Sequence, residues 1–438
     1  MTAEIAILNK SAVALAADSA VTISHGTAQQ KIFDTADKLF ELSNKDAIGI
    51  MINNDMNFLE TPLPVLIKKF RAQAPTFESV ENASENFLLY LTGFIEQSSD
   101  KVRTRAFRAS IQPLYVALQE RFGKRWQRRV FDDDQPGLRQ EYVDDPGLVS
   151  KAISDALDEE LAVFRRLFEG LPDAEFIGGG EVEVGDVEED CLELIAREHL
   201  DSATDPQIRE SVEIGKLSLL KRGTMGPVTG VIIAGFGKDD LFPTLISYDL
   251  SGAVGGWLKV DKTNHVDIDR DGEKAKVIPF AQREMVERFL YGLDHSIQQQ
   301  ITSFCRSSVP VISEQMIDAI DLPDNERAGL STIAENAQVA FFNGLDEHGF
   351  DAIRKKSREE IEDMVEFMPK PEMARMAEAL INLTSIKRRV SRGFETVGGP
   401  IDVAVISQAE GFVWVRRKHY FPQELNGRYL RRMGAEGS

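Results

Sequence analysis

The chain opens on an alternation of apolar runs and polar turns that predicts a β-hairpin. Residues 3–8 (AEIAIL) and 12–17 (AVALAA) are apolar, and the polar stretch NKS separates them. KLFEL and AIGIMI flank the turn SNKD and predict a second hairpin. At the other end of the chain, IDVAVIS, QAEG and GFVWVRRKHY predict a third. Hairpins from the two chain ends can lie in one pair of sheets.

Between these hairpins the apolar period is mostly that of helices. Residues 62–131, 149–170 and 190–200 carry apolar side chains at spacings of three and four. Residues 280–305 predict one long amphipathic helix, and residues 313–388 predict further helices. The pattern therefore places long helical stretches between groups of strands.

Three other segments break the helical pattern. The run VTGVIIAGFG at 228–237 is apolar throughout, which is typical of a strand buried on both faces, and shorter strands follow it. The acidic segment 132–148 contains two Pro-Gly pairs and predicts an exposed loop, whereas 178–190 predicts a loop or a short edge strand. The order is strands, helices, strands, helices, strands, which predicts an α+β fold.

Composition narrows the classes of function. The 438 residues carry a net charge of −20, which argues against nucleic acid or an anionic membrane as the main partner. Two cysteines exclude a disulfide framework and a cysteine-rich zinc site, and the six histidines lack metal-ligand spacing, so no metal or cofactor is expected. With neither a signal peptide nor a membrane span recognisable, we expect a cytoplasmic protein.

The candidate chemistry lies at the start of the chain, where Thr2 directly follows Met1. Once Met1 is removed, the Thr2 hydroxyl can attack a carbonyl while its own α-amino group accepts the proton. A nearby lysine favours the neutral, basic form of that amine, and a carboxylate would hold the lysine. Asp18 ends the second predicted strand and Lys38 begins the third, so these three residues are the candidate catalytic set.

The same stretches resemble a known family. TAEIAILNKSAVALAADSAVT and ADKLFELSNKDAIGIMI resemble the opening of proteasome β subunits and of the bacterial HslV-type peptidase. VIIAGFGKDDLFPTLISYDLSG and VGGPIDVAVISQAEGFVWVRRK resemble later hairpins of the same family, in the same order. The likeness covers roughly a third to a half of the chain.

The resemblance implies an N-terminal nucleophile (Ntn) hydrolase fold, an αββα sandwich of two antiparallel sheets between helical layers. It implies Thr2 as nucleophile and base, Lys38 as the cation that tunes the amine, and Asp18 as its partner. Ser19 matches a position of the family's AADS motif and is expected to be structural. Lys31 is a rival for the lysine role, and the hairpin that follows Lys38 favours Lys38.

The sequence also departs from the family. Asn54, or Asn53, stands where the family has a glycine that offers its N–H to the oxyanion. The serine of the loop before the long helix has no counterpart in VIPFAQ, and the D-x-x-S-G-G element reads FETVGG, so Glu395 or Thr396 would have to substitute. The supporting residues around the candidate set therefore differ from the family's.

The pattern divides the chain into core segments and helical insertions. The division is 1–97 as the first half of the core, 98–205 as a helical and acidic insertion, 206–304 as core strands and a long helix, 305–370 as a second helical insertion, and 371–438 as the last core helix and hairpin. The insertions either cap a chamber, mediate contacts between copies, replace a partner, or only enlarge the subunit.

Three functions stay open at this point. The first is a threonine peptidase that works as a homo-oligomer, with an unfoldase as a candidate partner. The second is a hydrolase that acts on a small amide instead of a polypeptide. The third is a catalytically inactive structural or interaction protein, which the retained Thr2, Asp18 and Lys38 disfavour and the altered supporting residues favour.

Overall fold

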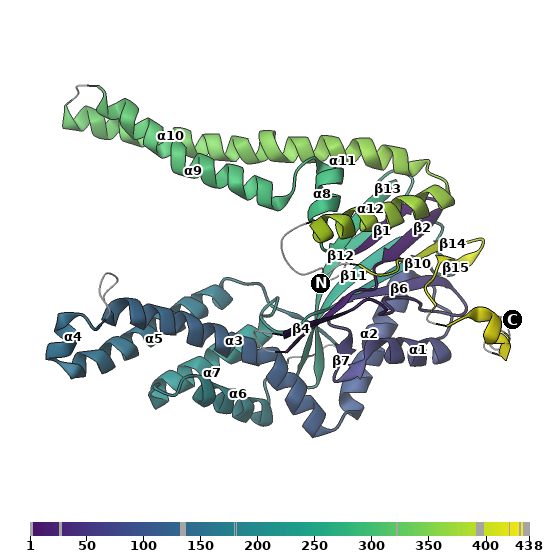
Figure 1. Ribbon diagram of the computed structural model, residues 1–438, viewed down its shortest axis with the longest axis horizontal. Helices are drawn as coiled ribbons and strands as arrows, with labels where there is room; N and C mark the ends of the chain where they lie inside the picture. The colour runs from purple at the N-terminus through teal and green to yellow at the C-terminus, as the bar shows by residue number, and fades with distance from the viewer. Residues whose placement is uncertain are drawn as a thin grey trace. The chain divides into compact units, whose positions relative to one another are not determined.

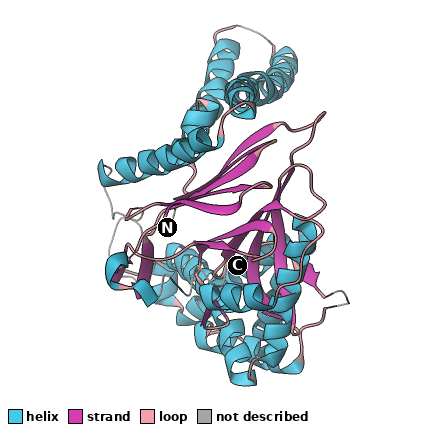
Figure 2. Cartoon of the chain, turned by 90° about the vertical axis from the view of Figure 1, so that its right-hand side faces the viewer, coloured by secondary structure: helices cyan, strands magenta, loops and turns pink. Residues whose placement is uncertain are grey.

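The computed structural model of the chain consists of two compact units. It describes residues 3–25, 29–131, 137–178, 182–320, 323–390, 398–419 and 421–428, together with Gly180 and Arg431. The first unit comprises residues 1–39, 241–243 and 267–438, and the second comprises residues 40–240 and 244–266. Figure 1 labels helices and strands of both units, and Figure 2 shows the same chain coloured by secondary structure.

The first unit is built on a five-stranded antiparallel sheet of order β13-β1-β2-β14-β15. Its strands are β1 (Ala3–Asn9), β2 (Ala12–Ala17), β13 (Ala275–Ala281), β14 (Asp402–Ser407) and β15 (Gly411–Arg416). The N-terminal hairpin therefore pairs directly with the C-terminal one, through β2 and β14, which confirms that both chain ends share a sheet. A separate ribbon is formed by β3 (Val21–His25) and β4 (Gln29–Phe33).

The first hairpin is fixed by its turn and by burial on both faces. The Asn9 side chain accepts hydrogen bonds from the backbone N–H groups of Ser11 and Ala12, and it donates to the carbonyls of Val365 and Met368. Every residue of β1 and β2 is buried. A shift of one residue in the register would exchange the two faces of each strand, so this packing specifies the register tightly.

Helices of the first unit pack against this sheet. They are α8 (Glu284–Tyr291), α9 (His295–Asp318), α10 (Asp324–Gly344), the π-helical η1 (Leu345–Phe350), α11 (Asp351–Glu366), α12 (Lys370–Val390) and the short 3₁₀ helix η2 (Gln423–Leu425). α12 lies along β1 and β2, and α8 packs on α11 and α12. Val286, Met373 and Leu380 join Ile5 and Ile7 in one apolar core.

The prediction of a single helix over 280–305 is wrong. Residues 280 and 281 end β13, and the helical part is divided between α8 and α9. Gly292 ends α8 with a left-handed φ of 70°, a conformation that favours glycine. The buried Asp294 then caps α9, because its carboxylate accepts the N–H of Ile297 and a hydrogen bond from Arg288.

The second unit contains a six-stranded sheet of order β5-β6-β10-β11-β12-β9. Its strands are β5 (Leu39–Glu41), β6 (Ala47–Asn54), β9 (Glu175–Ile177), β10 (Thr229–Phe236), β11 (Thr244–Val254) and β12 (Trp257–Asp267). A small ribbon of β7 (Asn57–Phe58) and β8 (Thr61–Pro62) follows β6. All eight residues of β10 are buried, which confirms the prediction made for its continuous apolar run.

The helices of the second unit form two groups. The first group is α1 (Leu63–Gln73) and α2 (Val80–Gln97), whose apolar faces share a core with β6, β10 and β11. The second group is α3 (Asp100–Val130), α4 (Gln140–Asp144), α5 (Pro146–Glu169), α6 (Asp186–His199) and α7 (Asp205–Leu220). α3, α5, α6 and α7 enclose a second core, so the 98–205 segment packs together with α7 beyond it.

The segment 132–148 differs in part from the exposed loop that its composition predicts. Residues 140–144 form α4, and α5 begins at residue 146 with the side chain of Asp145 accepting the N–H of Gly147. Residues 132–136 lie outside the described part of the chain. Helical structure thus begins within this acidic segment, because Asp145 caps a new helix where proline at the first helical position is tolerated.

The chain therefore belongs to the α+β class, with an antiparallel sheet and packed helices in each unit. Across the described residues, no helix combines the length and the apolar character that crossing a bilayer requires.

Candidate functional site

Asp18 lies at the end of β2 and is bound to the first described residue of the chain. Its backbone N–H donates to the carbonyl of Ala3 at 3.0 Å, and its Oδ1 accepts the Ala3 N–H at 3.2 Å. Asp18 is 1% exposed. Because Ala3 is covalently joined to Thr2, these two bonds fix the start of β1 immediately beside the candidate nucleophile.

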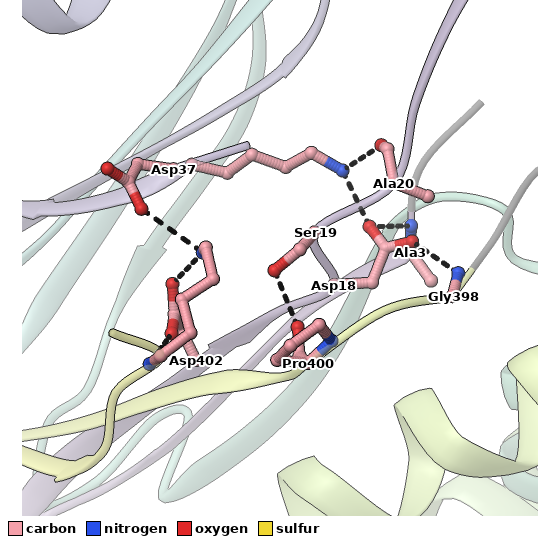
Figure 3. Close-up of polar contacts among 10 residues, drawn as sticks. Ala3, Asp18, Ser19, Ala20, Asp37, Gly398, Pro400 and Asp402 are labelled. Carbon is pink, nitrogen blue, oxygen red and sulfur yellow. Dashed lines mark hydrogen bonds and ion pairs between the residues drawn. The ribbon is translucent and has the colours of Figure 1, made fainter. Parts of the chain in front are cut away.

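Lys38 reaches the same carboxylate from the segment that precedes β5. Its Nζ lies 2.6 Å from Asp18 Oδ1 and donates also to the carbonyl of Ala20 at 2.6 Å (Figure 3). The side chain is fully buried. A buried ammonium is tolerated when a carboxylate and further acceptors surround it, so this ion pair is held in one geometry.

The second oxygen of Asp18 is bound by the segment that precedes β14. The Gly398 N–H donates to Asp18 Oδ2 at 3.1 Å, and the Gly398 carbonyl accepts the Ser19 N–H at 3.2 Å. The Ser19 hydroxyl donates to the carbonyl of Pro400 at 2.5 Å. The carboxylate thus has partners on both oxygens, and the two chain ends meet at it.

Gly399 is required by the conformation of this segment. Its φ of 76° is left-handed, and a Cβ at this position would lie 2.4 Å from the carbonyl oxygen of Asp34. A larger residue would have to displace the backbone near Asp34, and with it the neighbouring Gly398 N–H. This conformation explains why a glycine stands at position 399 in the sequence VGGP.

A second group of ion pairs involves Asp37, the residue that precedes Lys38. The Lys418 ammonium pairs with the buried Asp402 and lies 3.2 Å from Asp37, the residue before Lys38 (Figure 3). The Lys418 N–H also donates to Asp402 at 2.8 Å. These bonds tie the chain after β15 to the base of Lys38. Both residues belong to the stretch VGGPIDVAVISQAEGFVWVRRK, but sequence reasoning gave neither Asp402 nor Lys418 a role.

The structure brings together only part of the predicted set. Asp18, Lys38 and Ser19 lie in one cluster, whereas Thr2, Glu395 and Thr396 lie outside the described residues. Lys31 is part of β4, and its side chain is likewise not among those described. The catalytic roles of all these residues stay predictions.

Asn54 belongs to the second unit, at the end of β6. Its φ is 62°, whereas Asn53 is buried within the strand. Asparagine adopts the left-handed region more readily than most residues. Of the two asparagines, Asn54 is therefore the one whose backbone has a conformation that glycine commonly adopts.

Sequence reasoning missed that the backbone N–H of Gly398 binds the carboxylate of Asp18. The signal for it was present, since VGGP puts two glycines directly before the last predicted hairpin. What the sequence does not show is that this turn lies against Asp18, 380 residues earlier. Among the described residues, no group of three or more acidic, histidine or cysteine side chains is arranged to hold a metal ion.

Comparison with known proteins does not assign this chain to a family. No model of a protein family matches the chain, and no curated protein matches it. A solved structure of Anbu (ancestral beta-subunit) from Yersinia bercovieri is similar over 99% of this chain and 95% of its own, with 9% identity and a TM-score of 0.25. A TM-score this low does not establish a common fold.

The assignment to the family of proteasome β subunits and HslV-type peptidases is therefore wrong. A member would be expected to match a family model or a curated relative, and this chain matches neither. The stretches that suggested the family are short strand-and-turn patterns, and buried hairpins with small residues can produce similar patterns in unrelated chains. The site has to be interpreted from its own geometry.

Proposed function

We propose that this protein is an amide hydrolase in which Thr2, made N-terminal by removal of Met1, is the nucleophile. The observation that carries the proposal is the buried Asp18–Lys38 ion pair, which is hydrogen-bonded to Ala3, the residue that follows Thr2. A buried ion pair contributes little to stability compared with apolar packing, so its presence at the start of the chain favours a role in chemistry.

Each group has a defined role in this proposal. The Thr2 oxygen forms a bond to the substrate carbonyl carbon, and the α-amino group of Thr2 takes the hydroxyl proton and passes it to the leaving amine as the C–N bond breaks. Water then hydrolyses the ester, and the hydroxyl of Thr2 is restored. Lys38 and Asp18 do not form covalent bonds in this scheme.

Lys38 is suited to act on Thr2 because, among the described residues, only two of its three N–H donors have a partner. An ammonium group has three N–H donors, and Asp18 and Ala20 account for two of them among the described residues. We assign the third to the hydroxyl or amine of Thr2. Asp18 then positions Lys38, and the Gly398 N–H positions Asp18.

Other parts of the proposal rest on sequence alone. Asn54 is the candidate donor to the oxyanion through its backbone N–H, and Glu395 and Thr396 are candidate supporting residues. Polypeptides and small amides are both candidate substrates. The cytoplasmic location, a homo-oligomeric state and an unfoldase partner also stay predictions.

The test begins with the chain end. Intact-mass measurement of the purified protein should show that Met1 is absent. A β-lactone or epoxyketone probe should then form an adduct that peptide mapping places on Thr2, and this adduct should not form with Thr2→Ala. Retention of Met1, or labelling at another residue, would contradict the proposal.

Turnover of a panel of fluorogenic peptides and small amides completes the test. Thr2→Ala should abolish hydrolysis with an unchanged circular dichroism spectrum, whereas Thr2→Ser, which keeps a hydroxyl, should retain a measurable fraction. The panel also decides between polypeptide and small-amide substrates. Equal activity of Thr2→Ala and the parent protein would exclude Thr2 as the nucleophile.

A further inference from the structure

The last third of α3 carries five cationic side chains on one face of the helix. Successive members are spaced so that each has another three or four residues away, which are the spacings that share a helix face. They are Arg121, Lys124, Arg125, Arg128 and Arg129. Residues 121–130 contain no acidic residue, although the whole chain has a net charge of −20. Positive charge is therefore concentrated here on a strongly acidic protein.

These five cations line a cavity of about 460 Å³ between α3 and α5. The two helices pack against each other within the second unit (Figure 1). Among the described residues, Glu160 of α5 is the one other residue that lines the cavity, so no apolar or aromatic side chain contributes to the lining. Pockets for drug-like ligands are mostly apolar, so this cavity suits a highly charged ligand.

Two carboxylates of α5 hold three of the arginines in place. Glu160 is 2% exposed and accepts hydrogen bonds from Nε of Arg121 at 3.0 Å and from Nε of Arg125 at 2.5 Å. Glu159 accepts from Arg125 at 2.9 Å and from Arg129 at 2.5 Å. A guanidinium has five N–H donors, so each arginine keeps donors for a ligand. Because the arginines are already held, less side-chain entropy is lost when a ligand binds.

The two carboxylates do not balance the five cations. Lys124 and Arg128 are exposed, and neither side chain makes an ion pair or hydrogen bond with another described residue. Like charges three or four residues apart destabilise a helix. The negative end of the helix dipole offsets this only in the last turn, at Arg128 and Arg129. The positive charge from Arg121 to Arg125 is left without that compensation, which favours a bound anion.

We propose that this cavity binds a compact oligophosphate. The planar guanidinium group matches phosphate oxygens in a bidentate geometry, and lysine adds a point charge. Five cations against two carboxylates leave an excess of three positive charges. Between Arg121 and Arg129 the helix rises about 12 Å, so one short phosphate chain can reach the whole set.

The lining also decides between kinds of anion. An acidic protein segment is a poorer occupant, because protein interfaces are centred on aromatic or apolar anchors and the described lining offers no pocket for one. Nor does the lining offer an aromatic ring on which a nucleotide base could stack. We therefore assign recognition to the phosphate chain itself, whether inorganic or part of a nucleotide. Asp18 and Lys38 belong to the first unit, so this proposal does not depend on the proposed hydrolysis.

Isothermal titration calorimetry of the full chain with sodium tripolyphosphate, in a metal-free buffer of low ionic strength, tests the site. The parent protein should bind one equivalent, and added salt should weaken the binding because it screens the charges. The double variant Lys124→Gln/Arg128→Gln should bind about tenfold more weakly or worse, with an unchanged circular dichroism spectrum. The matched control is Lys68→Gln/Lys101→Gln, which removes the same charge from exposed positions outside the cavity and should bind like the parent.

Titration with other anions tests the class of ligand. Adenosine triphosphate should bind within a few-fold of tripolyphosphate, whereas citrate should bind more weakly, because a carboxylate has fewer acceptor oxygens than a terminal phosphate. Much tighter binding of adenosine triphosphate, or equal binding of citrate, would overturn the assignment to a phosphate chain. Equal loss of affinity in the two double variants would overturn the site. So would the absence of binding to the parent protein, which is the result expected if carboxylates of the chain itself fill the cavity.

Discussion

Each of the two units buries one lysine among its described residues, and the two lysines differ in what surrounds the charge. Lys38 in the first unit contacts the buried carboxylate of Asp18 and one carbonyl. Lys259, on β12 of the second unit, donates only to the carbonyls of Ser218 and Gly223. Burial lowers the pKa of Lys259 to about 8, and the charge of nearby Asp261 opposes this shift.

The difference separates a structural lysine from a candidate catalytic one. The bonds of Lys259 tie the end of α7 and the chain that follows it to a sheet strand. The bonds of Lys38 hold a carboxylate that is itself bound to the first residue of β1 and to the turn before β14. Burial of a lysine is therefore not sufficient to indicate chemistry, and it is the carboxylate at the chain start that distinguishes Lys38.

Asp18→Ala should have the largest effect, because it leaves the Lys38 charge buried without its carboxylate. We expect hydrolysis to be lost and the free energy of unfolding to fall by about 3–5 kcal/mol. Turnover and urea denaturation measure the two effects. Asp261→Ala is the control in the other unit, since it should lower stability and leave turnover unchanged. Full activity of Asp18→Ala would remove Asp18 from the site.

Lys38→Met should reduce turnover by about 100-fold or more, whereas Lys31→Met should change it only mildly. The reason is that the Lys38 ammonium pairs with the carboxylate that binds Ala3, the residue after Thr2, and that we assign its third N–H to Thr2. Steady-state kinetics on both variants, with circular dichroism as a check on folding, makes the comparison. If Lys31→Met is the inactive variant, the lysine of the site has been assigned to the wrong strand.

Lys259→Met should alter the dependence of stability on pH without affecting turnover. In the parent protein, the unfolded chain holds this proton up to its usual pKa of 10.5, and the folded chain loses it near pH 8. The unfolded state thus binds more protons between these values, so this lysine makes stability rise with pH in that window. Below about pH 8 the buried Lys259 side chain is charged, and it then destabilises the folded protein to its full extent.

The corresponding measurement is urea denaturation of the parent and of Lys259→Met at pH 7 and pH 10. The free energy of unfolding of Lys259→Met minus that of the parent protein should fall by about 2 kcal/mol on going from pH 7 to pH 10. A difference in stability that is the same at both pH values would show that Lys259 does not titrate in this range.

Ser19→Ala should have the smallest effect. The hydroxyl donates one hydrogen bond to the Pro400 carbonyl, and losing it should cost about 1 kcal/mol of stability. Turnover should stay within a few-fold of the parent value, because Asp18 keeps its bonds to Lys38, Ala3 and Gly398. A loss of turnover as deep as that of Asp18→Ala would instead place Ser19 in the chemistry.

The local pattern of the sequence correctly predicted the hairpins and many of the helices. Alternating or continuous apolar runs joined by short polar turns specify strands through nearby residues alone, as in β1–β2 and β14–β15. The pattern misled where two elements have matching apolar phases, since the helical period continues from α8 into α9 across Gly292. The family resemblance was also misleading, because short strand motifs carry information about hairpins and not about ancestry.

The sequence by itself determined that a threonine follows Met1, that a hairpin comes next, and that Asp18 and Lys38 stand at the ends of predicted strands. Only the tertiary structure decided that Lys38 reaches Asp18, and that the Gly398 N–H completes the carboxylate from the other end of the chain. Likewise, only the structure showed that the cations of α3 line a cavity beside Glu160 of α5. The physical reason is that hydrogen bonds and burial between distant segments depend on how the sheet brings those segments together, and residue spacing does not encode this.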